Sequence, residues 1–182
     1  FSLRRLSAEE VRDSLLAVSG QLDPTPGGPV LKVKNRGYLF DHTSIDLTDY
    51  TSNRRSIYLP VIRNNVCDLF QLLDFPDPAI PTGDRAASTI APQALLMMNS
   101  DFVMQSADQL ALRVQAESGT TAERLATLSR QLYAREATPE EIESNSQLLA
   151  ELEQSLEPIE PDARIRSQQA WSALCQTLLA AN

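Results

Sequence analysis

Residues 54–99 read RRSIYLPVIRNNVCDLFQLLDFPDPAIPTGDRAASTIAPQALLMMN, and three local patterns follow one another there. The β-branched and aromatic run at 56–61 predicts a strand, and Pro60 places it at the edge or the end of a sheet. Asn65 is suited to cap a short helix over 66–73, whose apolar residues fall on one face. This part of the stretch therefore predicts a small irregular β-containing insert.

The second half of the stretch is a loop that leads into another helix. Its prolines at positions 76, 78 and 81 favour extended backbone. Ser88 or Thr89 then caps a helix in which Pro92 is tolerated, because first-turn N–H groups have no intrahelical partner.

On the N-terminal side of this stretch, capping predicts one further helix. Ser7 and Glu10 form a capping box, a stripe of Val11, Leu15 and Val18 follows, and Gly20 ends the helix. Residues 23–29, DPTPGGP, then predict a loop. A short edge strand is expected at 30–33, and an extended loop or weak hairpin at 37–53.

On the C-terminal side the chain is predicted to be helical throughout. Ser100, Thr120 and Thr138 stand where helix caps are expected, and the last helix follows Pro158 and Pro161. The predicted apolar stripes comprise Val103, Ala107, Leu110 and Val114; Leu125, Leu128 and Leu132; Ile142, Leu149, Leu152 and Leu156; and Ile165, Trp171, Leu174 and Leu178. The expected fold is mainly α, a helical bundle with a small irregular β-containing insert. We expect a single domain over 1–182, with the first helix and the strand/loop insert in 1–100 and the bundle part in 101–182.

Composition and charge exclude some classes of function. The chain has 182 residues and a net charge of -8. Residues 117–182 alone hold 5 basic and 11 acidic residues, a net charge of -6. This acidic C-terminal part repels phosphate backbones, so we expect no nucleic-acid partner. No apolar run approaches the ~20 residues of a membrane span. Because the chain begins at Phe1, we interpret it as a fragment of a longer polypeptide.

Four arginines in or beside the opening stretch are candidate ligand-binding residues. They are Arg54, Arg55, Arg63 and Arg85. Guanidinium groups suit carboxylate or sulfate groups, as on acidic polysaccharides. The alternative is internal pairing with Asp74, Asp77 and Asp84 of the same stretch, which would anchor the proline-rich loop.

Those three aspartates are also candidate metal ligands. Carboxylates on flexible loops suit calcium, although the DxDxDG spacing of a calcium loop is absent. Asp41, Asp46 and Asp49 pose the same question. Two of these carboxylates in the right geometry would be a general acid/base pair. We interpret His42 as an ordinary loop histidine, since no GxSxG motif accompanies it. Cys67 and Cys175 fit no metal or haem spacing, and we interpret both as buried hydrophobes, with a disulfide left open for an exported protein.

The order of several segments resembles a planctomycete-type family known as domain of unknown function 1553. The segments are RRLSAEEVRDSLLAVSGQLDPTPGGP at 4–29, RRSIYLPVIRN at 54–64, DFPDP at 74–78, STIAPQALLMMNSDFV at 88–103 and LYAREATPEEI at 132–142. The resemblance implies an extracytoplasmic protein whose preceding N-terminal modules often include a cytochrome-c-like one. Any haem would then belong to such a module, since the chain has no CxxCH. The resemblance transfers no catalytic residue.

These observations lead to one hypothesis and two rivals. The chain holds no nucleophile–base motif, metal-ligand spacing or phosphate loop, whereas its apolar helix faces are typical of structural and interaction modules. We therefore expect a non-enzymatic module of a larger exported protein, whose partner is the N-terminal part of the same polypeptide. One rival is a carbohydrate-binding or carbohydrate-processing domain that uses the loop Arg and Asp residues. The other is a redox accessory to a haem module.

Overall fold

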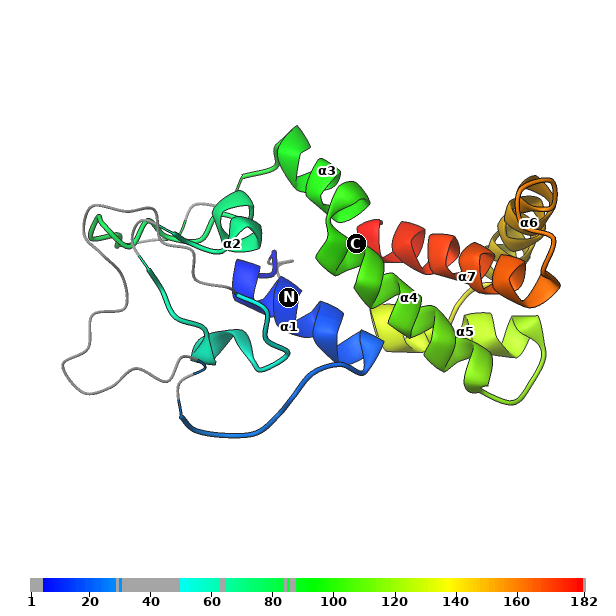
Figure 1. Ribbon diagram of the computed structural model, residues 1–182, viewed down its shortest axis with the longest axis horizontal. Coiled ribbons are helices and arrows are strands. Elements are labelled where there is room, and N and C mark those ends of the chain that lie inside the picture. Colours follow the sequence, from blue (N-terminus) through cyan, green and yellow to red (C-terminus); the bar gives the residue numbers. More distant parts are fainter. Residues whose placement is uncertain are drawn as a thin grey trace. The chain divides into compact units, whose positions relative to one another are not determined.

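The computed structural model describes residues 5–28, 30, 50–62, 65–83, 85 and 88–181. The chain divides into two compact units, of which unit 1 comprises residues 1–16 and 22–93 and unit 2 comprises residues 17–21 and 94–182. Seven α-helices lie in the described ranges, and most of the helical residues belong to unit 2 (Figure 1). The mainly α prediction is confirmed. The single-domain assignment stays a prediction. The edge strand expected at 30–33 and the loop or weak hairpin expected at 37–53 lie mostly outside the described residues.

Helix α1 spans Ala8–Ser19 and begins at the predicted capping box. The Ser7 N–H donates to Glu10 Oε2 at 2.7 Å, and the Glu10 N–H donates to Ser7 Oγ at 3.3 Å. Gly20 ends the helix with φ +75°, a left-handed conformation that glycine adopts without strain. The buried face differs from the predicted stripe, because Val11 and Val18 are only half-buried. The residues of α1 that are buried are Ala8, Arg12, Leu15, Leu16 and Ser19.

The predicted strand at 56–61 is wrong. Ser56–Tyr58 forms a 3₁₀ turn, η1, and the described residues contain only two isolated bridges, Asp23 with Arg54 and Ile62 with Asn65. A β-branched run favours a strand only when a neighbouring strand gives it a pleated surface to pack against. Here Ile57 is 77% exposed and no such neighbour lies in the described ranges. The small β-containing insert is therefore not seen in the described part of the chain.

The remaining elements of unit 1 are short. Helix α2 spans Asp68–Leu72, with Cys67 rather than Asn65 as its N-cap, and buries Leu69 and Phe70. The rings of Phe70 and Phe75 stack at a centroid distance of 5.1 Å. Helix α3 spans Ala91–Asn99 and crosses from unit 1 into unit 2 after residue 93.

Unit 2 consists largely of four helices, and Ser100, which was predicted to cap the first of them, stands at its N-cap position without a side-chain capping hydrogen bond. The four helices are α4 (Asp101–Ala116), α5 (Thr121–Tyr133), α6 (Pro139–Leu156) and α7 (Ala163–Ala180). Capping boxes open α5 and α6, where Thr120 pairs with Glu123 and Thr138 with Glu141. Both N-terminal predictions are confirmed.

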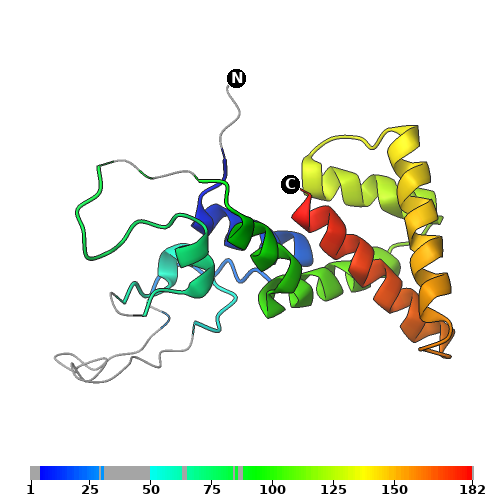
Figure 2. The ribbon, with the colours of Figure 1, turned by 90° about the horizontal axis from the view of Figure 1, so that it is seen from above.

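The four helices contact one another in a closed ring. Helix α4 packs against α5 and α7, and α6 packs against α5 and α7. Helix α6 is steeply inclined to α5 (Figures 1 and 2). The stripe predicted for α4 is buried in full, and α7 adds Trp171, Leu174 and Cys175 to the core. Ile165, which was predicted to join them, is exposed. Within the described residues, no helix has both the length and the apolar character needed to cross a bilayer.

Candidate functional site

Arg54 is the first of the predicted ligand-binding residues, and its guanidinium holds a loop of unit 1. It donates hydrogen bonds to the carbonyl oxygens of Thr25 at 2.9 Å, Gly27 at 2.5 Å and Gly28 at 2.9 Å. The same group lies 4.2 Å from the centre of the Tyr58 ring, a cation–π geometry. The Tyr58 hydroxyl in turn accepts from the Gly27 N–H at 3.1 Å. Arg54 therefore fastens residues 25–28 to the start of η1.

Arg55 and Arg85 pair with carboxylates of α1. Arg55 Nε lies 3.7 Å from Asp13 Oδ2, and Arg85 Nη1 donates to Glu9 Oε2 at 2.9 Å. Burial raises the pKa of Glu9, but the hydrogen bond from Arg85 and the backbone contacts outweigh it, so the pKa lies below its ordinary value. Both arginine side chains are at least half exposed, so the pairs add little stability. Internal pairing was expected with the loop aspartates, whereas these partners are on α1.

Asp74, the first of the predicted metal ligands, joins the two ends of the proline-rich loop. Its carboxylate accepts hydrogen bonds from the N–H and the hydroxyl of Ser88, both at 2.7 Å. Gln93 Nε2 and Arg5 Nη1 each donate to Asp74 Oδ2 at 3.3 Å. The hydrogen bond from the Ser88 backbone is the main reason that the pKa of Asp74 lies below its ordinary value. Ser88 is thus bound to Asp74 rather than capping α3.

Asp77 is the other predicted metal ligand that the structure describes, and it makes a local contact. Asp77 accepts the N–H of Ala79 at 2.8 Å, which closes a local turn. The residues that the structure describes contain no group of three His, Cys, Asp or Glu side chains placed to hold a metal ion. Asp84 and Arg63 lie outside the described residues, as do Asp41, His42, Asp46 and Asp49.

Arg12 is a central residue of unit 1 that sequence reasoning missed. Its side chain is 4% exposed, donates to the Arg54 carbonyl oxygen at 2.9 Å and to Ser56 Oγ at 3.3 Å, and also contacts the Ser52 carbonyl oxygen. Burial lowers the pKa of the guanidinium, and the neighbouring Asp13 carboxylate acts in the opposite direction. The available signal was its spacing, because Arg12 lies four residues after buried Ala8 and four before buried Leu16.

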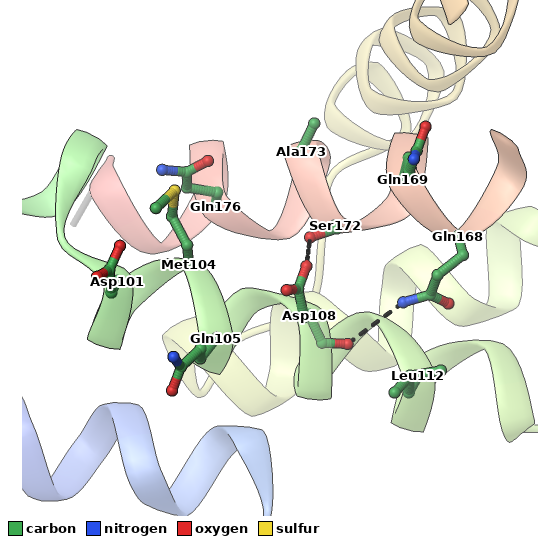
Figure 3. Close-up of a pocket in the computed structure, with 10 residues that line it drawn as sticks. All are labelled: Asp101, Met104, Gln105, Asp108, Leu112, Gln168, Gln169, Ser172, Ala173 and Gln176. Carbon is green, nitrogen blue, oxygen red and sulfur yellow. Dashed lines mark hydrogen bonds between the residues drawn. The ribbon is translucent and has the colours of Figure 1, made fainter. Parts of the chain in front are cut away.

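A groove on unit 2 is a second candidate site. It lies between α4 and α7 and has a volume of about 650 Å³ (Figure 3). The residues that line it are Asp101, Met104, Gln105, Asp108, Leu112, Gln168, Gln169, Ser172, Ala173 and Gln176. The lining residues that belong to α4 recur at helical spacing, on the face of the helix opposite its buried residues. Among them, the side chains of Met104 and Leu112 are 38% and 49% exposed.

Polar contacts cross the groove and tie its two helices together. The Ser172 hydroxyl donates to Asp108 Oδ1, and Gln168 Nε2 donates to the Asp108 carbonyl oxygen at 3.4 Å (Figure 3). At one end, Gln176 Nε2 donates to the Met98 carbonyl oxygen at 2.6 Å. Two carboxylates and no lysine or arginine line the groove. It therefore offers a neutral-to-acidic surface with an apolar side chain towards each end.

The sequence contained only a weak signal for this groove. Met104 and Leu112 are apolar residues on the otherwise polar face of α4, a pattern that is common on protein surfaces. Met104 and Leu112 line one groove only because α4 packs against α7. The groove residues of α7 lie more than 50 positions further along the chain.

Comparison with known proteins places the chain in a family. Neither the curated proteins nor the solved structures compared with the chain include a match. A family model described as "Protein of unknown function (DUF1553)" matches residues 1–149, which is most of the chain and includes both α1 and the segment of Arg54 and Asp74. The chain therefore belongs to the DUF1553 family of proteins of unknown function.

Proposed function

We propose that this chain is a structural and interaction module of a larger exported protein, and that it packs against the polypeptide preceding it in that protein. The observation that carries the proposal is the groove between α4 and α7. Met104 and Leu112 remain accessible there although the opposite face of α4 is fully buried. Exposed apolar groups within a concave surface are typical of surfaces that receive another chain.

The contacts of unit 1 support a scaffolding role for the segment that contains Arg54 and Asp74. Arg54 holds residues 25–28, Asp74 holds Ser88, and Arg12 holds residues 52–56 against α1. In each case a charged side chain fixes the backbone of a loop at a point far away in the sequence. Such contacts order long connections that have little secondary structure of their own.

The polysaccharide alternative would require the candidate arginines to leave their partners within the chain and to bind an external ligand. Arg54 would have to release three carbonyl oxygens of its own loop, and Arg85 would have to leave Glu9. Among the candidate arginines that the structure describes, Arg55 has the most exposed side chain, and it would be the first to reach a polyanion. Binding to a panel of sulfated and uronic-acid polymers tests the polysaccharide hypothesis, and the Arg55→Ala variant shows whether any binding depends on this arginine.

The proposal is tested by mixing the purified 182-residue chain with the remainder of its parent polypeptide, expressed without these residues. Calorimetry and gel filtration should show a one-to-one complex. Absence of both heat and co-elution at micromolar concentrations would overturn the proposal. Binding of a sulfated polymer that the Arg55→Ala variant loses would instead favour the polysaccharide function.

A further inference from the structure

Four polar side chains of unit 1 form a connected hydrogen-bonded network, which we call the Asp74 cluster. Its members are Arg5, which precedes α1, Asp74, which follows α2, Ser88, and Gln93 in the first turn of α3. We propose that the Asp74 cluster is a conformational device that keeps α3 helical, and that opening the cluster allows α3 to unwind. The inference concerns unit 1 and α3, and it stands or falls independently of the proposed function.

Gln93 connects the cluster to α3. The residue is only 6% exposed, and its side-chain amide is hydrogen-bonded on both sides. The oxygen Oε1 accepts from Arg5 Nη2 at 2.8 Å and from the Ile90 N–H at 3.3 Å. The nitrogen Nε2 donates to Asp74 Oδ2 and to Ser88 Oγ, both at 3.3 Å. These four partners hold the amide firmly, because a buried polar atom that loses its hydrogen bond carries a large desolvation penalty.

Helix α3 has little else to keep it helical. It consists of nine residues, all within the described part of the chain, and isolated helices shorter than about 12–15 residues are marginal in water. Gln93 is the only buried residue of these nine, and the leucines and methionines of α3 are exposed or half-buried. At the other end, Gln176 Nε2 donates to the Met98 carbonyl oxygen at 2.6 Å. Polar contacts at its two ends therefore contribute much of what keeps α3 helical.

The place of α3 in the chain gives the device its consequence. Gln93 is the last residue of unit 1, and residues 94–99 belong to unit 2. While the Asp74 cluster is closed, this connection between the units is a continuous helix, and when the cluster opens it becomes flexible chain. The side chain of Arg5 is 38% exposed, against 19% for Asp74, so we expect the cluster to open at Arg5.

Hydrogen exchange of the full 182-residue chain tests the inference at the backbone amides of residues 95–100. Gln93→Glu keeps the size of the side chain but replaces the donor Nε2 with an oxygen that faces the Asp74 carboxylate. Exchange at 95–100 should become about tenfold faster or more. The matched control is Ala94→Glu, which places the same charge at the next, exposed position of α3. It should leave exchange within about twofold of the wild type, because a negative charge is tolerated near a helix N-terminus.

A second variant tests the cluster from outside α3. Arg5→Ala removes one donor to Asp74 and one to Gln93 without changing any residue of α3. The same amides should exchange roughly three- to tenfold faster. Arg55→Ala is the matched control, since Arg55 pairs with Asp13 instead, and it should leave exchange at 95–100 unchanged. Asp74 itself is left in place, because at its φ of +60° most other side chains would add backbone strain of their own.

The location of the faster exchange decides the outcome. The amides of α5 and α6 should keep their wild-type protection in both cluster variants, and if Gln93→Glu does not fold, Arg5→Ala provides the test. Wild-type rates at 95–100 in Arg5→Ala would overturn the proposal. Equal acceleration in α5 and α6 would overturn it too, since the chain would then be destabilised as a whole. So would equal acceleration by Ala94→Glu and Gln93→Glu, which would assign the effect to added charge alone.

Discussion

The guanidinium of Arg12, buried in unit 1, donates a hydrogen bond to the carbonyl oxygen of Arg54 at 2.9 Å. One charged side chain of α1 thereby holds the backbone of a residue whose own guanidinium holds a different loop. The two arginines form successive links from α1 to residues 52–56 and on to residues 25–28. Because these segments have little regular structure, their order depends on such links.

Replacing Arg12 with leucine should destabilise the chain by about 3 kcal/mol, because two partly buried carbonyl oxygens and the buried Ser56 hydroxyl would lose their donor. Urea denaturation followed by circular dichroism measures this change. Arg164→Leu is the control, since that side chain is 94% exposed, and its effect should stay within about 0.5 kcal/mol. Equal effects of the two substitutions would contradict the central role of Arg12.

Replacing Arg54 with alanine should loosen residues 25–28 rather than unfold the chain. The variant loses three hydrogen bonds to carbonyl oxygens and the contact with the Tyr58 ring, at a cost of about 1–2 kcal/mol. Limited proteolysis or hydrogen exchange should show faster cleavage or exchange within that loop. Arg55→Ala serves as the comparison. Equally fast cleavage or exchange of residues 25–28 in both variants would contradict the role of Arg54 in holding this loop.

The two cysteines should differ in reactivity. Both are free thiols in the structure, Cys175 buried and Cys67 half-buried. Burial raises the pKa of Cys175 to about 12, so at pH 8 only about one molecule in ten thousand carries the thiolate. A thiol reagent should therefore modify Cys67 first and reach Cys175 only when urea unfolds the chain. Rapid labelling of Cys175 in the native Cys67→Ala variant would refute this.

The ionisation of Glu141 should make the free energy of unfolding depend on pH in the acidic range. Two hydrogen bonds from Arg135, at 2.8 and 2.6 Å, and one from the Thr138 N–H lower its pKa from 4.5 to about 2. The folded state thus binds this proton less readily than the unfolded state. The stabilisation is complete above about pH 5 and disappears as the pH falls towards 2.

The variant Glu141→Gln tests this dependence. It should be less stable than the wild type at pH 6, and the difference should shrink steadily as the pH is lowered to 2.5. Urea midpoints at several pH values give the comparison, with Glu143→Gln as the control. A difference that does not vary with pH would show that the charge of Glu141 is not responsible.

Local signals predicted the helices well and the links between loops poorly. The capping boxes at Ser7, Thr120 and Thr138 lie where the sequence placed them, because a cap involves residues only three positions apart. The strand expected at 56–61 was wrong because a strand needs a partner that composition does not reveal. Asp74 was considered as a metal ligand, yet its contact with Ser88 spans 14 positions and leaves no trace in the local pattern.

The sequence by itself determined the mainly helical character, the starts of α1, α5 and α6, the buried stripe of α4 and the family of the chain. These features depend on periodicity, on short-range hydrogen bonds and on an ordered set of segments. Only the tertiary structure decided that Arg12 is buried, that Arg54 and Asp74 hold loops, and that α4 and α7 enclose a groove. The physical reason is that each of these depends on contacts between residues far apart in the chain, whose partners are selected by packing and by the need to satisfy buried polar groups.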